Sequence, residues 1–394
     1  MLFFWLNPVV PRRPQYRLPA ETSGAGGIFF WLFALLVIAI IACVWWTSRK
    51  PAAKPAPVKS PPMVAKNSAA APARPPVVAV VPVNPPPSPT PVPEPATKIA
   101  VASPSTNSFP RPPRDPLETQ IALARLAISS GSIDGVSGSQ TRAALQAFQR
   151  QHELPATGEL DAATRAALSL ASPSLTSYVI TSNDLARLQP LSKTWLGKSQ
   201  QTALDYETLL ELVAEKGHAS PTLTRHLNPG VNWTNLAVGA EVKIPDVEYP
   251  APKTKAAFVV ISLAERRLEA FDDHTNLLAH FPCSIAAKYE KRPVGELYVK
   301  AIAPNPNYTF DPEVFPESEE ARPIKTKLVI PPGPNNPVGT AWISLDRPGY
   351  GMHGTPSPEQ VGRTESHGCF RLANWNADLL IQLVFVGMPV RVEP

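Results

Sequence analysis

The sequence has few cysteines, and none of them forms a pattern typical of disulfide frameworks or zinc knuckles. Only three of the 394 residues are cysteine, Cys43, Cys283 and Cys369, and no C-x-x-C pair occurs. An odd number of widely spaced cysteines argues against both kinds of site. It leaves room for a single reactive thiol.

A dense block of basic residues is also absent. The net charge is +5, and lysine and arginine are spread along the chain. Because a nucleic-acid interface needs its basic residues clustered on one face or element, we expect no nucleic-acid partner.

Proline, in contrast, is abundant and unevenly distributed. Residues 51–113 contain 20 of the 49 prolines, together with Ala, Val, Ser and Lys. Such a composition favours extended polyproline II structure, with plain disorder as the alternative. In either case residues 47–113 are predicted to be a linker.

An uninterrupted apolar run precedes this linker. Residues 28–46 comprise 19 apolar residues, enough for a helix that crosses the roughly 30 Å hydrocarbon layer. Tryptophans near its ends suit the headgroup zone. We favour an uncleaved transmembrane helix after an N-terminal tail (1–27) over a signal peptide, whose apolar core is usually shorter. Basic residues flank both ends, so charge alone does not decide the orientation.

Residues 114–172 are predicted to form three helices separated by turns. Apolar residues recur at helical spacing from Leu117 to Ile128, and Ser139 and Asp161 are candidate caps of the second and third helices. The segment IDGVSGSQTRAALQAFQRQHELPATGELDAATRAAL resembles the peptidoglycan-binding type 1 domain. That resemblance implies binding to wall glycopeptide; a helical spacer bundle is the alternative.

Residues 173–250 are predicted to be a small α+β domain, with a strand from Tyr178 and a helix over 208–215. The ending LNPGVNWTNLAVGAEVKIP resembles the second half of a LysM module, a βααβ glycan binder. The first half departs from that pattern around residues 189–202. Glycan binding and a purely structural connector both remain open.

The C-terminal part, residues 256–394, shows short β-type runs separated by turns. The expected strands are 258–262, 267–271, 297–299, 341–344 and 390–392. This pattern is typical of an antiparallel sandwich or barrel.

Two motifs in this part carry reactive side chains, GMHGT at 351–355 and SHGCFRL at 366–372. A cysteine nucleophile must be a thiolate, so it needs a base or a positive environment. His367 is two residues before Cys369 and would face the same side of an extended segment. His353, at the end of a preceding strand, could meet the thiol across the sheet. Gly368 allows close approach of a substrate carbonyl, and nearby backbone amides could stabilise an oxyanion.

Each of these residues also has a less specific interpretation. A free cysteine is more often a small buried hydrophobe, and a histidine is often simply a core residue. Two histidines and one cysteine could ligate zinc, but a closed site needs a fourth ligand. The clustering with glycines favours a nucleophile site, and we predict neither a metal nor a cofactor.

The segment HGTPSPEQVGRTESHGCFRL is similar to the catalytic signature of YkuD-type L,D-transpeptidases. The similarity extends over most of residues 256–393, although Arg292 stands where the family usually has Thr. The resemblance implies a mainly-β YkuD-type sandwich and an L,D-transpeptidase that acts on peptidoglycan. Cys369 would attack the bond between the diamino acid and the fourth-position D-alanine of a stem peptide. D-Alanine would leave, and an amine would then resolve the thioester.

The resemblance also implies roles for the surrounding residues. His353 would be the general base, oriented by the backbone around Gly354, while His367, Gly368 and the Cys369 amide would form the oxyanion side. Arg371 would bind a substrate carboxylate or brace the loop. The substrate-binding residues would be Arg371, Ser366, Tyr350 and Thr355.

An insertion over residues 305–336 (the insertion) could cover the donor stem. Tyr308 and Phe310 are candidate lid aromatics, with core packing as an equal alternative. Cys283 is expected to be a packed thiol, and its pairing with Cys369 would silence the enzyme.

The alternatives to a transpeptidase are a catalytically silent wall-binding anchor and an L,D-carboxypeptidase. We expect a single-pass protein of the bacterial inner membrane with its C-terminal domains on the periplasmic or wall side. The oligomeric state is left open.

Overall fold

The computed structural model describes residues 108–314, 318–366 and 368–394. The predicted tail (1–27), the predicted transmembrane helix (28–46), nearly all of the linker and His367 lie outside these residues. Within the described part of the chain, no helix is long and apolar enough to cross a membrane. The membrane anchor therefore stays a prediction.

Three helices form the helical region, in the order expected. They are α2 (Pro116–Ala124), α3 (Ser139–Gln151) and α4 (Ala162–Ala167). Asp161 caps α4 by accepting a hydrogen bond from the Thr164 amide at 2.8 Å. The prediction of Ser139 as a cap is wrong. Gly138 takes that position in an extended conformation, so Ser139 is already the first helical residue.

The helical region has its own apolar core. Its fully buried large side chains come from α2, from α3 and from the segments that follow the helices: Ile121, Leu123, Ile128, Ile133, Phe148, Leu168 and Leu170. Helical spacing in the sequence therefore identified the buried faces correctly.

The middle region contains a two-stranded antiparallel sheet, β1 (Leu175–Val179) with β2 (Glu241–Pro245). Two helices, α7 (Leu209–Lys216) and α8 (Pro221–Leu227), follow one another between these strands in the sequence. The described order is β1-α5-α6-α7-α8-β2, with two more helices than a βααβ module has, and β1 begins three residues before the predicted strand. Two further short helices are α5 (Ser182–Ala186) and α6 (Trp195–Ser199), and α6 lies where the sequence departs from the LysM pattern.

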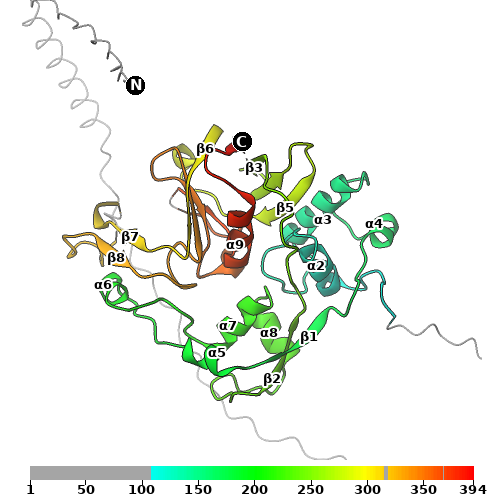
Figure 1. Cartoon of the computed structure of the whole chain (residues 1–394), viewed down its shortest axis with the longest axis horizontal. Coiled ribbons are helices and arrows are strands. Elements are labelled where there is room, and N and C mark those ends of the chain that lie inside the picture. Colours follow the sequence, from blue (N-terminus) through cyan, green and yellow to red (C-terminus); the bar gives the residue numbers. More distant parts are fainter. Residues whose placement is uncertain (1–107, 315–317, 367) are drawn as a thin grey trace, which may run out of the picture. The chain divides into compact units, whose positions relative to one another are not determined.

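The C-terminal region is built on an eight-stranded sheet in the order β11-β10-β9-β6-β12-β3-β4-β5. Figure 1 labels three of these strands, β3, β5 and β6, together with helix α9 (Asn374–Leu383). Its strands are β3 (Phe258–Ser262), β4 (Arg267–Phe271), β5 (Leu277–Pro282), β6 (Gly295–Pro304), β9 (Ala341–Leu345), β10 (Gly351–His353), β11 (Phe370–Arg371) and β12 (Pro389–Glu393). Three short 3₁₀ helices lie in the connections, Tyr289–Lys291, Pro312–Val314 and Pro358–Gln360. The prediction of a mainly-β domain is confirmed.

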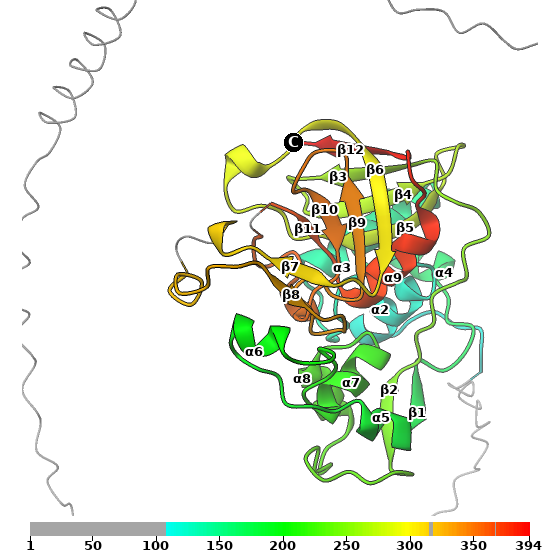
Figure 2. The ribbon, with the colours of Figure 1, turned by 60° about the vertical axis from the view of Figure 1, so that its left-hand side comes forward.

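The eight strands form one curled sheet, so of the two predicted forms, sandwich or barrel, the structure is nearer to the barrel. Strand β6 is long and bends at a register shift between Val299 and Ala301, pairing first with β12 and then with β9. Ser284, two residues after the end of β5, exchanges backbone hydrogen bonds of 2.9 and 3.0 Å with Arg371. The two ends of the sheet therefore meet. Helix α9 (Asn374–Leu383) packs its buried leucines into the core beside β6, β9 and β10 (Figure 2).

The expectation of a purely antiparallel sheet is wrong. The pairs β10–β11 and β12–β3 are parallel. In both cases a long connection returns the chain in the same direction, as parallel pairing requires. The first of these pairs carries the reactive motifs.

The insertion forms a hairpin of its own, β7 (Tyr308–Phe310) with β8 (Leu328–Ile330). Its buried side chains, Phe310, Ala321 and Ile330, pack with Leu204 of the middle region in a small separate core. Thus the insertion is held by residues outside the C-terminal region.

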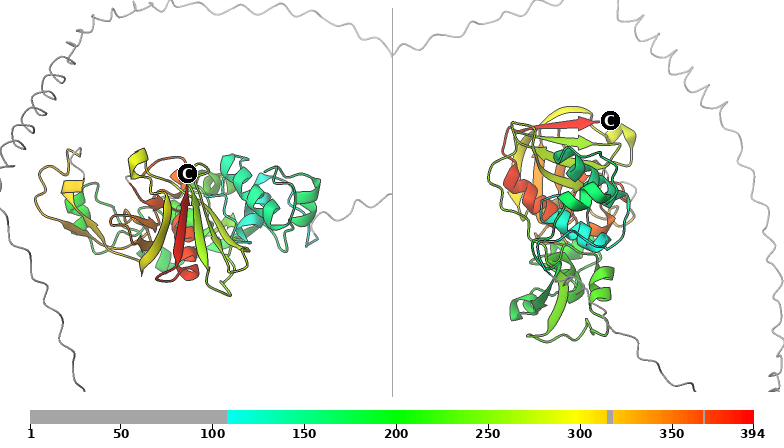
Figure 3. Two further views of the ribbon diagram at one scale, coloured as in Figure 1. Left: turned by 90° about the horizontal axis from the view of Figure 1, so that it is seen from above. Right: turned by 90° about the vertical axis from the view of Figure 1, so that its right-hand side faces the viewer.

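The helical region docks on the sheet beside β5 (Figure 3). The Ser129 amide donates to the His280 carbonyl at 2.8 Å, and the His280 amide donates to Ala127 at 3.0 Å. Arg150 forms a 2.8 Å ion pair with the buried carboxylate of Glu269. Residues 127–129 consequently extend the sheet by one short strand-like segment.

Candidate active site

Cys369 directly precedes β11, which runs parallel to β10. Met352 pairs with Phe370, and His353 pairs with Arg371. Met352 and Phe370 are buried in the core. Because side chains alternate between the faces of a strand, His353, Cys369 and Arg371 lie on the other face. The structure thus puts the predicted nucleophile and the predicted base on the same face of this strand pair.

The Cys369 sulfur lies against the backbone that leads into β10. Its Sγ is 3.4 Å from the Gly349 carbonyl oxygen, and the side chain is half-buried. Burial raises the pKa of the thiol to about 11, while a hydrogen bond from the Gly351 amide acts in the opposite direction. At neutral pH the thiol is therefore protonated, and a base must remove its proton before it can attack.

His353 is buried at the end of β10 and is held by a hydrogen bond to the next residue. Its Nδ1 lies 2.6 Å from the Gly354 carbonyl oxygen. A carbonyl only accepts, so Nδ1 carries the proton and Nε2 carries the lone pair. Burial lowers the pKa of His353 to about 4, with the Gly354 hydrogen bond opposing. The imidazole is consequently neutral at pH 7 and can accept a proton at Nε2.

The turn around Cys369 is closed by the side chain of Ser366. Its hydroxyl donates to the Cys369 carbonyl at 2.6 Å and accepts from the Gly368 amide at 3.2 Å. The Ser366 backbone is fixed in turn by a 2.8 Å hydrogen bond to Ile285. Ser366 thus shapes the nucleophile turn, whereas His367, between these residues, lies outside the described part of the chain.

Arg371 holds the segment that precedes this turn. Its Nη2 donates to the Thr364 hydroxyl at 3.1 Å and to the Glu365 carbonyl at 2.5 Å. Its Nε is buried and has no hydrogen-bond partner among the described residues. Burial lowers the pKa of this guanidinium. These contacts brace the loop, and the predicted binding of a substrate carboxylate stays a prediction.

Tyr350 lies in the turn between β9 and β10. The guanidinium of Arg347 stands over its ring at 4.8 Å, and its amide donates to the Arg347 carbonyl at 3.1 Å. The ring packs against the main core. Tyr350 therefore stabilises the backbone on which the Cys369 sulfur rests.

Thr355 is buried directly after the His353–Gly354 pair. Its amide donates to the Asn374 side-chain oxygen at 3.0 Å, and the Thr340 amide donates to the same oxygen at 3.3 Å. A Cβ on Gly354 would lie 2.3 Å from that oxygen. Only glycine fits there, so Asn374 packs tightly behind the predicted base.

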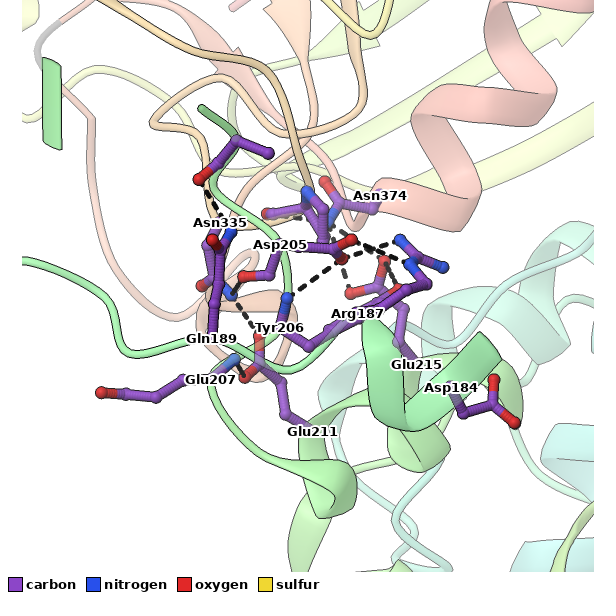
Figure 4. A network of polar contacts seen from close by, with 12 residues as sticks. Asp184, Arg187, Gln189, Asp205, Tyr206, Glu207, Glu211, Glu215, Asn335 and Asn374 are labelled. Atoms are coloured by element: carbon purple, nitrogen blue, oxygen red, sulfur yellow. Dashed lines mark hydrogen bonds and ion pairs between the residues drawn. The ribbon is translucent and has the colours of Figure 1, made fainter. Parts of the chain in front are cut away.

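Asn374 and Glu215 are site residues that the sequence did not indicate. The Asn374 amide nitrogen donates to both oxygens of the Glu215 carboxylate, at 3.2 and 3.3 Å (Figure 4). Burial raises the pKa of Glu215 to about 7. An asparagine at a helix start suggests a cap, so nothing in the sequence places Asn374 behind His353.

The site also raises the questions of metal ligands and of a disulfide between its cysteines. No group of three His, Cys, Asp or Glu side chains able to hold a metal ion occurs among the residues that the structure describes. Cys283 and Cys369 are both free thiols. Cys283 is fully buried, and burial raises its pKa. It is therefore the packed thiol that was predicted.

Comparison with known families identifies two parts of the chain. Residues 256–392 match the family described as L,D-transpeptidase catalytic domain, YkuD. Residues 115–168 match the family described as "Putative peptidoglycan binding domain". Both lie where the corresponding resemblances were found in the sequence.

Relatives of known name agree with the catalytic match. The chain is 25% identical over 185 residues to "Putative L,D-transpeptidase YkuD" of Bacillus licheniformis, covering 47% of this chain and 93% of that protein. It is 31% identical over 166 residues to "Probable L,D-transpeptidase YbiS" of Escherichia coli, covering 42% of this chain but only 53% of that protein. A solved structure, L,D-transpeptidase 3 from Mycobacterium tuberculosis with a faropenem-derived adduct, matches 41% of this chain and 76% of its own at 18% identity, with a TM-score of 0.29.

Proposed function

We propose that this chain, an enzyme of the L,D-transpeptidase class, uses Cys369 to transfer peptidoglycan stem peptides to an acceptor amine. The observation that supports the proposal is the parallel pairing of β10 with β11, which puts the side chains of His353 and Cys369 on the same face of the strand pair. A protonated thiol and a neutral imidazole whose Nε2 carries a lone pair can act as a nucleophile and its base.

The first half-reaction forms a thioester. His353 Nε2 takes the Cys369 proton as the sulfur attacks the carbonyl carbon of the bond between the diamino acid and D-alanine. The carbonyl oxygen becomes an oxyanion, which backbone amides of the nucleophile turn stabilise. The imidazolium then returns its proton to the departing amine. D-Alanine leaves, and the stem remains attached to sulfur.

The second half-reaction releases the stem to an amine. The amine attacks the thioester carbon, and its proton passes to His353 and from there to the departing sulfur. An amide bond forms, and the Cys369 thiol is restored. Water in place of the amine would give L,D-carboxypeptidase action through the same intermediate.

The parts of the chain before the catalytic region would hold the enzyme at the cell wall and at the membrane. The helical region, residues 115–168, supports attachment to peptidoglycan through its family match. The apolar run at 28–46 and the proline-rich linker would tether the enzyme to the inner membrane, with its C-terminal regions on the wall side. This arrangement keeps the catalytic region within reach of new stem peptides.

The test is to incubate the full chain with disaccharide-tetrapeptide and analyse the products by mass spectrometry. We expect loss of D-alanine and a cross-linked dimer, whereas a tripeptide alone would indicate the carboxypeptidase. Cys369→Ala should abolish D-alanine release. Cys283→Ala, which alters the other free thiol of the described residues, should retain it. Release that survives Cys369→Ala would refute the proposal.

A further inference from the structure

Helix α6 of the middle region supports the β7–β8 hairpin of the insertion. The Trp195 ring stacks on Phe310 with 4.2 Å between ring centroids and 12° between planes. It also lies 6.2 Å from the ring of Tyr308 on the same strand. The Trp195 amide donates to the side chain of Glu320, at the far side of the hairpin. One aromatic side chain thus contacts a strand that is more than a hundred residues away in the sequence.

The contacts of Trp195 bear on the insertion that is predicted to cover the donor stem. Phe310, which Trp195 stacks on, is fully buried in the small core of this hairpin, and Trp195 and Tyr308 pack against the same core. Burial raises the pKa of Tyr308, and the charge of the Cys369 thiolate raises it further. Because Trp195 packs against β7, it supports the strand that carries Tyr308 and Phe310.

A short backbone contact joins the hairpin base to the middle region. The Leu204 amide donates to the Pro332 carbonyl at 2.8 Å, and the Asn335 amide donates to the Leu204 carbonyl at 3.0 Å. A Cβ on Gly333 would lie 2.2 Å from the Leu204 carbonyl oxygen. The backbone segments at Gly333 and Leu204 are therefore too close for a side chain at position 333. The insertion is therefore fixed to the middle region at its base as well as at β7.

A second contact from the middle region reaches the other side of the site. The Asn374 amide nitrogen faces Glu215 and also the Pro334 carbonyl at 3.2 Å. Its oxygen faces the amides of Thr340 and Thr355. The donation to Glu215 and the two hydrogen bonds that the oxygen accepts together fix which end of the Asn374 amide faces the His353–Gly354 turn. Figure 4 shows the Asn374–Glu215 pair.

We propose that Trp195 and Glu215 are positioning residues of the active site. Trp195 holds the β7–β8 hairpin of the insertion, which is predicted to cover the donor stem, and Glu215 holds Asn374 against the turn that orients His353. The middle region thereby acts as an intramolecular brace for the insertion and for this turn. This proposal rests on the proposed function, because it assigns to these residues a part in the same reaction.

Trp195→Ala should free the hairpin without disturbing the base. We expect iodoacetamide to alkylate Cys369 about fivefold faster, because the half-buried sulfur becomes more accessible. The KM for disaccharide-tetrapeptide should rise about fivefold while kcat changes little. Trp195→Phe, which keeps an aromatic ring for stacking, should restore both values. The matched control is Leu196→Ala on the same helix, where the side chain is 52% exposed and should matter little.

Glu215→Leu should have the opposite effect on the thiol. With Asn374 no longer held, His353 loses its support, so alkylation of Cys369 should slow and kcat should fall about tenfold at unchanged KM. Glu215→Gln should restore both, since its side-chain oxygen still accepts from Asn374. If the two residues only stabilised the fold, Trp195→Ala and Glu215→Leu would both lower the amount of folded enzyme. The rate of Cys369 alkylation would then not rise in one variant and fall in the other.

The experiment uses the full chain of each variant. The fraction of molecules whose Cys369 can react is measured by labelling with a carbapenem until no further label is added, and kcat is expressed per labelled molecule. Wild-type protein that releases no D-alanine would refute the proposed function, yet the alkylation rates would still test the positioning. If Trp195→Ala and Leu196→Ala match wild type in alkylation and KM, Trp195 has no positioning role. If Glu215→Leu retains the wild-type kcat per labelled site, Glu215 has none.

Discussion

His353 Nδ1 donates a 2.6 Å hydrogen bond to the carbonyl oxygen of Gly354, the residue that follows it on the chain. This bond fixes the tautomer and directs the unprotonated Nε2 away from the backbone. Because the histidine is neutral at pH 7 and the nearby thiol is protonated, the resting site is an uncharged pair. The chemical consequences of this resting state can be measured.

The first prediction concerns the pH dependence of thiol reactivity. With a thiol pKa of about 11, the thiolate fraction grows about tenfold per pH unit below that value. Alkylation of Cys369 by iodoacetamide should therefore accelerate continuously from pH 6 to pH 9. Stopped-flow or mass-spectrometric rates would measure this, with Cys369→Ala as the blank. A rate that is constant between pH 6 and pH 8 would indicate a preformed thiolate–imidazolium pair and contradict the prediction.

The second prediction identifies the base. His353→Ala should lower kcat by roughly 10²–10⁴-fold, the usual contribution of a general base, and should slow alkylation of Cys369 as well. His367→Ala should leave alkylation closer to the wild-type rate. The two variants are compared by D-alanine release and by alkylation. Should His367→Ala remove thiol reactivity while His353→Ala spares it, the roles of the two histidines must be exchanged.

The third prediction concerns stability and the buried carboxyl of Glu215. Burial and the neighbouring Asp378 and Glu211 carboxylates raise its pKa to about 7, although the Asn374 amide and the Tyr206 hydroxyl favour ionisation. The folded state then binds more protons than the unfolded state between about pH 4.5 and pH 7. The free energy of unfolding should therefore fall as pH rises through this window, by about 3 kcal/mol from this group.

Urea unfolding at pH 5 and pH 8 measures that difference. Glu215→Gln removes the titrating group, so the difference between the two pH values should shrink. Glu207→Gln, a substitution of an exposed glutamate on the same segment, is the control and should leave the difference unchanged. A variant Glu215→Gln with the full wild-type pH dependence would show that another group is responsible.

The fourth prediction concerns Gly354. A methyl group there would lie 2.3 Å from the Asn374 oxygen, inside the volume of that atom. Gly354→Ala should therefore destabilise the fold by about 1–3 kcal/mol, typical of overpacking, and should reduce kcat by displacing the turn that orients His353. Gly138→Ser serves as the comparison, since a Cβ at position 138 meets nothing within 4 Å. Equal melting temperatures for the two variants would contradict the expected steric conflict.

The sequence was most informative where local pattern determines structure. Strands 258–262 and 267–271 begin and end as predicted, because period-two alternation and flanking turns are local signals. His353 was predicted to end a strand, and it is the last residue of β10, which pairs with β11 directly after Cys369. Strands of two or three residues, such as β7, β8 and β11, are too short to show any periodicity.

The contacts that reach the site from the middle region could not be predicted in this way. Glu215 and Asn374 are separated by 159 positions, and each reads locally as an ordinary residue of a helix. Trp195 lies in a segment that was noted only for departing from the LysM pattern. Their functions depend on how separate regions pack, which neither periodicity nor turn chemistry encodes. Glycan binding by the middle region remains a prediction.

The short backbone pairing of residues 127–129 with His280 has a practical consequence for work on isolated fragments. A fragment that begins at residue 256 would expose main-chain groups of β5 that are covered in the longer chain. Uncovered strands recruit strands from neighbouring molecules. Such a fragment should self-associate during purification, whereas a version starting near residue 108 should stay monodisperse under the same conditions.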